Sequence, residues 1–337
     1  MMRRIAMSLL VAAGLACAGP GGPARAEVGE ITIAQQYGLL YLALMVMENN
    51  HVLEKHLAAA GLPSTKVNWV KFTGSSGGVD AVISGQVTLS AQGTPSMALL
   101  WDRTKGRLEV KGMAALCDGN IWINTRNPNV HSVKDFTDKD RIAIPSLKSS
   151  TQAILLQMEA ERVFGKGQFN RLEPLIVTMS HPDSVIAILN PSHEVTAHVA
   201  TSPFHEAEMK AGLHTITSAY DILGGQATTS NLVTTSKFRE ENPKSYAASL
   251  AALDEAFAWI SADKRRAAKL YIEMTNERRM SEDEVYAILT APGAEWGKTP
   301  HKVGKLVQFM HYVGTLKNRP ESWKDLYFPE AQALDGD

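Results

Sequence analysis

Short apolar runs alternate with longer amphipathic segments over the first two thirds of the chain. In residues 31–117 this pattern predicts strands at 31–34, 67–72, 87–91 and 108–117, and helices at 39–57, 77–84 and 95–105. A glycine follows the predicted end of each of these helices, where a residue that accepts a positive φ closes the last turn. Strands that alternate with helices in this way are typical of parallel βαβ units.

A second cycle of the same pattern covers residues 121–235. It predicts strands at 121–125, 141–145, 175–179, 195–200, 215–217 and 231–235, and helices at 150–164 and 182–189. From residue 242 onward apolar positions repeat at helical spacing, and Ser281 with Glu284 matches a helix-capping box. The pattern predicts two α/β lobes, each a mostly parallel sheet flanked by helices, with a C-terminal helical segment packed on one of them.

The first 26 residues have the pattern of a signal peptide. Arg3 and Arg4 precede an apolar run at 5–18, which is shorter than the ~20 residues of a membrane-spanning helix. Small residues at Ala24 and Ala26 favour cleavage before Glu27, with Gly19 as the alternative first residue. We therefore expect an exported, periplasmic protein.

Composition narrows the classes of function. The chain has 337 residues, of which 45% are hydrophobic and 20% charged, and its formal net charge is -1. This length predicts about two domains, and the near balance of charge argues against nucleic-acid binding. Two cysteines, one of them inside the predicted signal peptide, cannot form a disulfide scaffold.

Five polar loops follow predicted strands, at the sheet edge where open α/β folds bind ligands. Four of them introduce a helix, and the first turn of a helix has unpaired N–H groups and the positive end of the helix dipole. Such loops bind anions or polar groups, although each Ser, Thr or Gly can also serve only as a cap or turn. The expected ligand-binding residues are Gln36, Tyr37, Ser75, Ser76, Gly77, Gln92, Gly93, Thr94, Ser149, Ser150, Thr151, Ser202 and Phe204.

One of these loops also matches a motif of serine hydrolases. Residues 74–78 read G-x-S-x-G between a predicted strand and a helix, so Ser76 is a candidate nucleophile. The helix that follows is short and the motif is weak in a loop rich in glycine and serine, so an exported hydrolase stays the alternative. The sequence has no CxxC, HExxH or P-loop pattern, and we predict neither a metal nor a cofactor.

Several longer stretches resemble the periplasmic substrate-binding proteins of nitrate, sulfonate and taurine ABC importers. They extend over almost the whole mature chain. They lie at 31–38 (ITIAQQYG), 84–87 (SGQV), 141–145 (RIAIP), 150–153 (STQA), 181–183 (HPD), 202–204 (SPF), 238–243 (FREENP) and 322–325 (SWKD). Many members carry an acidic residue after the SGQV turn, whereas residues 88–90 are neutral here, so the identity of the ligand does not carry over.

The resemblance implies a periplasmic binding protein of type II, a monomer without enzymatic activity, whose chain crosses twice between two lobes at 121–125 and 231–235. Lobe I would comprise 27–121 and 235–337, and lobe II 122–234. A small organic or inorganic anion would bind between the lobes, to be delivered to a membrane permease served by an ATPase. The candidate loops contain one cation, Lys148, so a neutral heterocycle such as a pyrimidine is also compatible.

Overall fold

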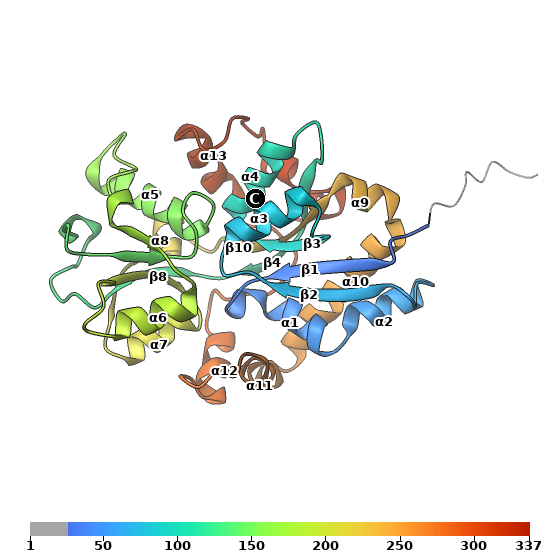
Figure 1. The fold of residues 1–337 in the computed structure, drawn as a ribbon, viewed down its shortest axis with the longest axis horizontal. Helices are drawn as coiled ribbons and strands as arrows, with labels where there is room; N and C mark the ends of the chain where they lie inside the picture. The colour runs from blue at the N-terminus through green and yellow to red at the C-terminus, as the bar shows by residue number, and fades with distance from the viewer. Residues whose placement is uncertain (1–25) are drawn as a thin grey trace, which may run out of the picture.

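The computed structural model describes residues 26–337, and the predicted signal peptide lies outside this range except for its last residue. Within the described range no helix is long and apolar enough to cross a membrane. These residues form two five-stranded sheets, which lie side by side along the long axis of the molecule (Figure 1).

The first sheet has the strand order β2-β1-β3-β10-β4. Strand β1 is parallel to β2 and β3, whereas β10 is antiparallel to β3 and β4. Its strands are β1 (Glu30–Gln35), β2 (Lys66–Lys71), β3 (Leu89–Gln92), β4 (Val110–Asp118) and β10 (Thr228–Thr235). The one reversed strand, β10, is the strand that returns from the second sheet.

The second sheet follows the same plan in the order β7-β6-β8-β5-β9. Strand β6 is parallel to β7 and β8, and β5 is antiparallel to β8 and β9. Its strands are β5 (Ile121–Thr125), β6 (Ile142–Ile144), β7 (Ile176–Thr178), β8 (Ala197–Thr201) and β9 (His214–Ser218). The reversed strand β5 is again the one that arrives from the other sheet, so the prediction of two mostly parallel sheets is confirmed.

Helices cover both faces of each sheet. The N-terminal helices are η1 (Leu39–Tyr41), α1 (Leu42–Asn49), α2 (Val52–Ala59), α3 (Ser75–Ser84) and α4 (Thr94–Thr104). The central ones are η2 (Val133–Asp135), α5 (Thr151–Phe164), η3 (Glu173–Leu175), α6 (His181–Leu189), α7 (Phe204–Lys210) and α8 (Ala219–Leu223). Figure 1 shows α1 and α2 on one side of the first sheet, and α3 and α4 on the other.

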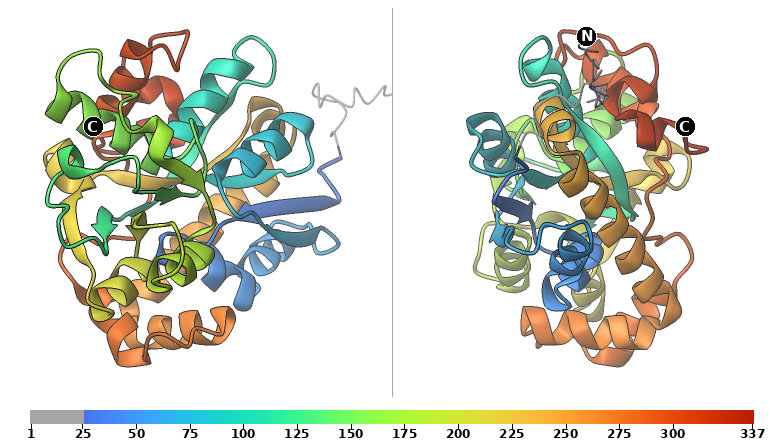
Figure 2. Two further views of the ribbon diagram at one scale, coloured as in Figure 1. Left: turned by 60° about the vertical axis from the view of Figure 1, so that its left-hand side comes forward. Right: turned by 90° about the vertical axis from the view of Figure 1, so that its right-hand side faces the viewer.

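The C-terminal helices contact elements of both sheets rather than one, which corrects the expectation from sequence. They are α9 (Ser236–Glu241), α10 (Pro243–Ala262), α11 (Lys264–Thr275), α12 (Glu282–Thr290), α13 (Val303–Tyr312), η4 (Trp323–Leu326) and α14 (Pro329–Gln332). Figure 2 shows α11 and α12 at one end of the molecule and α13 at the other. Lys210 of α7 pairs with Glu284 of α12 at 2.7 Å, and Lys305 of α13 donates to the Ile222 carbonyl at 2.9 Å.

The predicted elements exist, with shifted boundaries. The helix expected at 39–57 is interrupted, because His51 adopts the left-handed conformation (φ 50°) between α1 and α2. The capping box of Ser281 and Glu284 is confirmed at the start of α12. Strand β10 begins at Thr228 and pairs only within the first sheet, so the chain changes sheets before residue 228 and not at 235.

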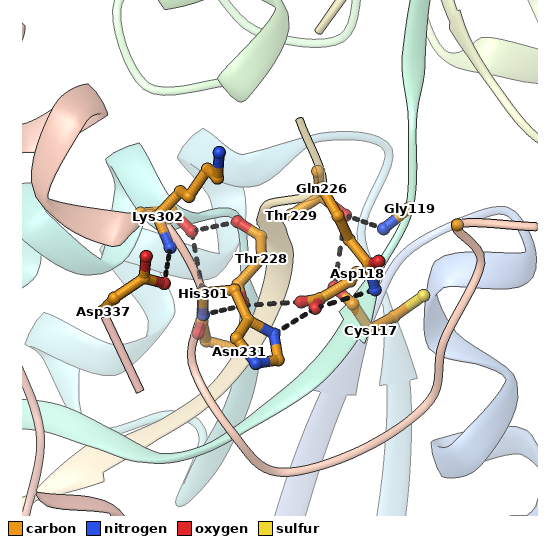
Figure 3. Close-up of polar contacts among 12 residues, drawn as sticks. Cys117, Asp118, Gly119, Gln226, Thr228, Thr229, Asn231, His301, Lys302 and Asp337 are labelled. Atoms are coloured by element: carbon orange, nitrogen blue, oxygen red, sulfur yellow. Dashed lines mark hydrogen bonds and ion pairs between the residues drawn. The ribbon is translucent and has the colours of Figure 1, made fainter. Parts of the chain in front are cut away.

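The two connections between the sheets meet at a buried carboxyl group (Figure 3). Asp118 ends β4 just before the crossover to β5, and it accepts a hydrogen bond of 2.7 Å from Thr228 Oγ1 at the start of β10. The His301 Nδ1 atom contacts the second oxygen of Asp118, and the His301 backbone N–H donates to Thr228 Oγ1 at 2.8 Å. Both crossovers and the segment before α13 are therefore tied to one point.

Candidate functional site

A small cavity lies between the two sheets, at the carboxyl ends of β1, β3, β6 and β8. The volume open to the centre of a water molecule is about 20 Å³. A site for a single water needs ~10–15 Å³ by the same measure, so the cavity has room for about one water. The first wall, from loops of the first sheet, consists of Gln36, Tyr37, Thr73, Ser75 and Gly93. The second wall, from loops of the second sheet, consists of Pro145, Thr151, Gln152, His181 and Thr201, and the remaining lining residues are Leu40, Tyr41, Ile121 and Thr229.

Four helices begin at this cavity. Ser75 and Thr151 are the first residues of α3 and α5, Gly93 caps α4, and His181 is the first residue of α6. The first turn of each helix has backbone N–H groups without an intrahelical partner, and the helix dipole places partial positive charge there. Convergent helix starts of this kind stabilise an anion without a cationic side chain. Neither lysine nor arginine is among the lining residues of this cavity.

One polar atom in the second wall is buried without a partner. Thr201, at the end of β8, is 1% exposed, and its Oγ1 has no hydrogen-bond partner within the described residues. A buried hydroxyl without a partner costs about 1–3 kcal/mol, so such groups usually have a role. Because Thr201 lines the cavity, a bound molecule could satisfy this hydroxyl.

A buried chain of polar side chains lies behind the second wall. Glu208 Oε1 on α7 lies 2.5 Å from His198 Nδ1 on β8, and His198 Nε2 lies 2.8 Å from His181 Nδ1. His181 Nε2 lies 3.1 Å from the Gln152 amide nitrogen, at the start of α5. His198 and Glu208 are fully buried, so the chain connects a buried carboxyl group to the cavity.

The environment of His181 favours its neutral form. Burial lowers the pKa of His181 well below its usual value, and His198 lowers it further. The His181 ring also stacks on Phe204 of α7, with centroids 5.3 Å apart and planes inclined by 16°. The imidazole is thus held in place from two sides where it lines the cavity.

The two walls touch each other across the cavity. Ser96 Oγ of α4 donates to the Ser149 carbonyl at 2.6 Å, and the Leu39 N–H donates to the Ser202 carbonyl at 3.1 Å. A Cβ atom at Gly93 would lie 2.7 Å from Thr151 Oγ1, so glycine is needed for this close approach. The structure therefore has the two sheets in a closed arrangement.

Five predicted ligand-binding residues line the cavity: Gln36, Tyr37, Ser75, Gly93 and Thr151. Three other predicted residues, Ser150, Thr94 and Gln92, do not line the cavity and form hydrogen bonds within the protein. Ser150 caps α5 by accepting from the Ala153 N–H at 3.2 Å, and Thr94 Oγ1 donates to the Thr228 carbonyl at 2.6 Å. The Gln92 amide donates to Ser90 Oγ at 2.8 Å, away from the cavity.

The remaining predicted residues lie around the cavity rather than in its wall. Ser76 is exposed, and its Oγ lies 3.3 Å from Ser146 Oγ. Ser202 Oγ donates to Glu206 at 2.7 Å and faces a second, largely apolar cavity of about 150 Å³. Gly77 packs against Phe72, Ser149 is buried beside Ser96, and Phe204 stacks on His181.

The hydrolase alternative lacks a base at Ser76. The hydrogen bonds of Ser76 in the described chain run from its backbone and hydroxyl to Ser146. A serine nucleophile needs a base within hydrogen-bond reach, which here would be His181, His205 or His301. His181 instead contacts His198 and Gln152, His205 contacts Asn124, and His301 contacts Asp118.

Sequence analysis missed much of the second wall and the buried chain behind it. In the sequence, Gln152 and His181 stand within the STQA and HPD stretches, and neither is among the predicted ligand-binding residues. Neither His198 nor Glu208 has a signal in the sequence, and an acidic residue such as Glu208 is ordinarily exposed and solvated. These residues become neighbours only when β8, α5, α6 and α7 pack together.

Of the comparisons with known proteins, the one with solved structures identifies the fold. No protein-family model and no curated protein matches the sequence. The structure is similar to the nitrate-binding protein NrtA from Synechocystis PCC 6803 (TM-score 0.69, 13% identity, 92% of this chain and 90% of that one). It is also similar to the alkanesulfonate-binding protein SsuA from Xanthomonas axonopodis pv. citri bound to MOPS (TM-score 0.67, 16% identity, 87% and 96%).

A third similar structure is the Candida albicans CA3427 gene product, described as having the generic periplasmic binding protein fold (TM-score 0.64, 12% identity, 87% of this chain and 93% of that one). These similarities extend over most of each chain. The chain therefore has the two-sheet α/β fold of periplasmic binding proteins.

Proposed function

We propose that this protein is the solute-binding component of an ABC importer and captures a small anion between its two sheets. The observation that carries this proposal is the convergence of four helix starts on one cavity, at Ser75, Gly93, Thr151 and His181. The unpartnered Thr201 hydroxyl in the second wall of this cavity adds a hydrogen-bond donor. The similarity to nitrate- and sulfonate-binding proteins supports the same class of ligand.

Binding would use closure of the two walls. An anion that contacts α3 and α4 on one side and α5 and α6 on the other has all four contacts only when the walls close on it, which supplies the differential affinity that closure requires. Because the present cavity has room for about one water, the walls would close on an anion at a wider separation than in this structure. We place the hinges at 119–120 and 224–227, between β4 and β5 and between α8 and β10, rather than within β10. The predicted signal peptide would place the protein in the periplasm, where it would meet its permease as a monomer.

A screen of ligands by thermal shift tests the proposal. Mature protein would be heated with sulfonates, nitrate, small carboxylates and pyrimidines, and hits would be titrated by calorimetry. A ligand at 100 times its Kd stabilises the protein by about 2.7 kcal/mol. Binding of an anion supports the proposal, whereas binding only of neutral pyrimidines favours the neutral heterocycle, which the lack of a lysine or arginine in the walls also permits.

A further inference from the structure

The hydrogen bonds of the buried chain behind the second wall run in one direction from donor to acceptor. At the inner end of the chain, each carboxyl oxygen of Glu208 faces a nitrogen atom. Glu208 Oε1 faces His198 Nδ1 at 2.5 Å, and Glu208 Oε2 accepts from the Asn124 amide at 2.7 Å. Asn124 is itself oriented, since its Oδ1 accepts from Thr215 Oγ1 at 2.8 Å. Glu208 Oε2 is thus an acceptor, and a proton-bearing histidine nitrogen is the matching donor for Oε1.

The outer end of the chain sets the direction through both imidazoles. The Gln152 amide nitrogen can only donate, so the His181 Nε2 atom 3.1 Å away accepts. A neutral imidazole has one donor and one acceptor nitrogen, so His181 carries its proton on Nδ1, which donates to His198 Nε2 at 2.8 Å. An acceptor at His198 Nε2 leaves the proton of His198 on Nδ1, which faces Glu208.

We propose that Glu208 and His198 act as positioning residues that hold His181 Nε2 as a hydrogen-bond acceptor toward the cavity. The ligand is then a small organic anion that also carries an O–H or N–H group, and this group replaces the Gln152 amide on His181. Nitrate and unsubstituted alkyl anions have no such donor and would bind more weakly. This ligand class rests on the proposed function, whereas the direction of the chain does not.

The side chains at the centre of the buried chain are removed from water. His181, His198 and Glu208 are buried, and Phe204 stacks on His181. A carboxylate in such a place needs its hydrogen bonds, since an unsatisfied buried charge is strongly destabilising. Reversal of the two imidazoles would leave Glu208 facing a lone pair, so one arrangement of protons is strongly favoured.

The direction of the chain can be tested without any ligand. In wild-type protein labelled with ¹⁵N, long-range proton–nitrogen correlation spectra at neutral pH should assign the proton of His181 to Nδ1, with the signal identified from a His181→Gln sample. Glu208→Gln should reverse both imidazoles, because the Asn124 amide holds the carbonyl oxygen of the new side chain, whose amide nitrogen then donates to His198 Nδ1. A proton on Nε2 of wild-type His181, or an unchanged spectrum in Glu208→Gln, would overturn the proposal.

The ligand class is tested with matched pairs of anions. The pairs are 2-hydroxyethanesulfonate with 2-methoxyethanesulfonate, and glycolate with methoxyacetate, in which the hydroxyl donates but the ether only accepts. Calorimetry on the wild type should show a preference for the hydroxy anion that drops at least about ten-fold in Glu208→Gln. The effect of the extra methyl group cancels in this comparison of ratios.

The outcomes separate the two proposals. An Nδ1 proton on His181 without binding of any of the four anions overturns the ligand class but leaves the direction of the chain established, and anion capture itself is contradicted only if the thermal-shift screen also finds no anion. Equal binding of both members of each pair supports anion capture and overturns the ligand class. The wild-type measurements decide both points even if the Glu208→Gln variant does not fold.

Discussion

The two walls of the cavity are built from different chemistry. The first wall relies on backbone, because α3 and α4 start at glycine caps, Gly74 and Gly93, and no charged side chain stands in it. The second wall relies on side chains, with His181 and Gln152 at its surface and His198 and Glu208 buried behind it. The first wall can therefore set how closely the sheets approach, and the second can select the ligand by its hydrogen bonds.

This difference has an energetic reason. Glycine allows close backbone contact at little cost in enthalpy, and its effect is steric and local. A buried carboxylate with two histidines is costly to desolvate and is stable only when each group has its partner. Changes in the first wall should thus affect closure, and changes behind the second wall should affect stability and pH dependence.

The largest effect is expected from a methyl group added at Gly74, the N-cap residue of α3 beside the first wall. A Cβ at Gly74 would collide with the Pro145 carbonyl oxygen and lie 2.5 Å from Ser146 Oγ, both across the cavity. Gly74 has extended backbone (φ -169°), so alanine causes no local strain. Gly74→Ala should hold the walls apart and weaken ligand binding by about 100-fold or more, equal to about 2.7 kcal/mol.

Small-angle scattering and calorimetry check this prediction. The Gly74→Ala protein should stay more expanded than the wild type at saturating ligand, with an unchanged melting temperature in its absence. Gly29→Ala is the matched control, because no atom lies within 4 Å of its added Cβ. Wild-type affinity in Gly74→Ala would show that the walls are not required to approach this closely.

His205 on α7, whose Nδ1 lies 3.1 Å from the Asn124 amide nitrogen, should make stability depend on pH. His205 stacks on Trp122, with centroids 3.9 Å apart, and burial lowers the pKa of His205 to about 4. The unfolded chain takes up this proton near pH 6.5 and the folded chain only near 4, so stability is lost as the pH falls between these values.

His205→Phe retains a stacked ring but removes the proton. Urea unfolding at several pH values should show the wild type losing stability relative to His205→Phe on acidification. The slope is at most about 1.4 kcal/mol per pH unit, and lower because the ring is partly exposed. Parallel curves for the two proteins between about pH 6.5 and 4 would contradict the assignment.

Two neighbouring residues at the start of α5 should affect different properties: Ser150 the stability of the fold, and Thr151 the binding of the ligand. Ser150 is a buried helix cap, so Ser150→Ala should lower the free energy of unfolding by about 1 kcal/mol. Thr151 lines the cavity, so Thr151→Ala should weaken binding by about ten-fold, or about 1.4 kcal/mol, with a smaller change in stability. Urea unfolding and calorimetry on both variants check this, and identical effects would mean that only helix capping matters.

The smallest effect is expected at Ser76. Its exposed hydroxyl contacts Ser146 and does not line the cavity, so Ser76→Ala should change stability and affinity by less than about 0.5 kcal/mol. The wild type should also resist labelling by a serine-directed organophosphate. Stoichiometric labelling at Ser76 would instead support the hydrolase.

Much of the architecture could be read from the sequence. The alternation of apolar strands and helices depends on local spacing, which is visible along the chain, and it predicted two mostly parallel sheets. The sequence also indicated that the loops after the strands lie together, because strand ends of one direction meet at one edge, and Gln36, Tyr37, Ser75, Gly93 and Thr151 line the cavity; that they bind a ligand stays a prediction. The sequence could not separate these from Ser150 or Thr94, since hydroxyl side chains cap helices and bind ligands equally well.

The tertiary structure alone decided the buried chain of polar side chains at and behind the second wall. Gln152, His181, His198 and Glu208 belong to four different elements and have no common spacing in the sequence. Their contacts arise because β8 is central in the second sheet, with α6 and α7 packed beside it. A titratable side chain acquires its role from burial and from its partner, and both are properties of packing rather than of position along the chain.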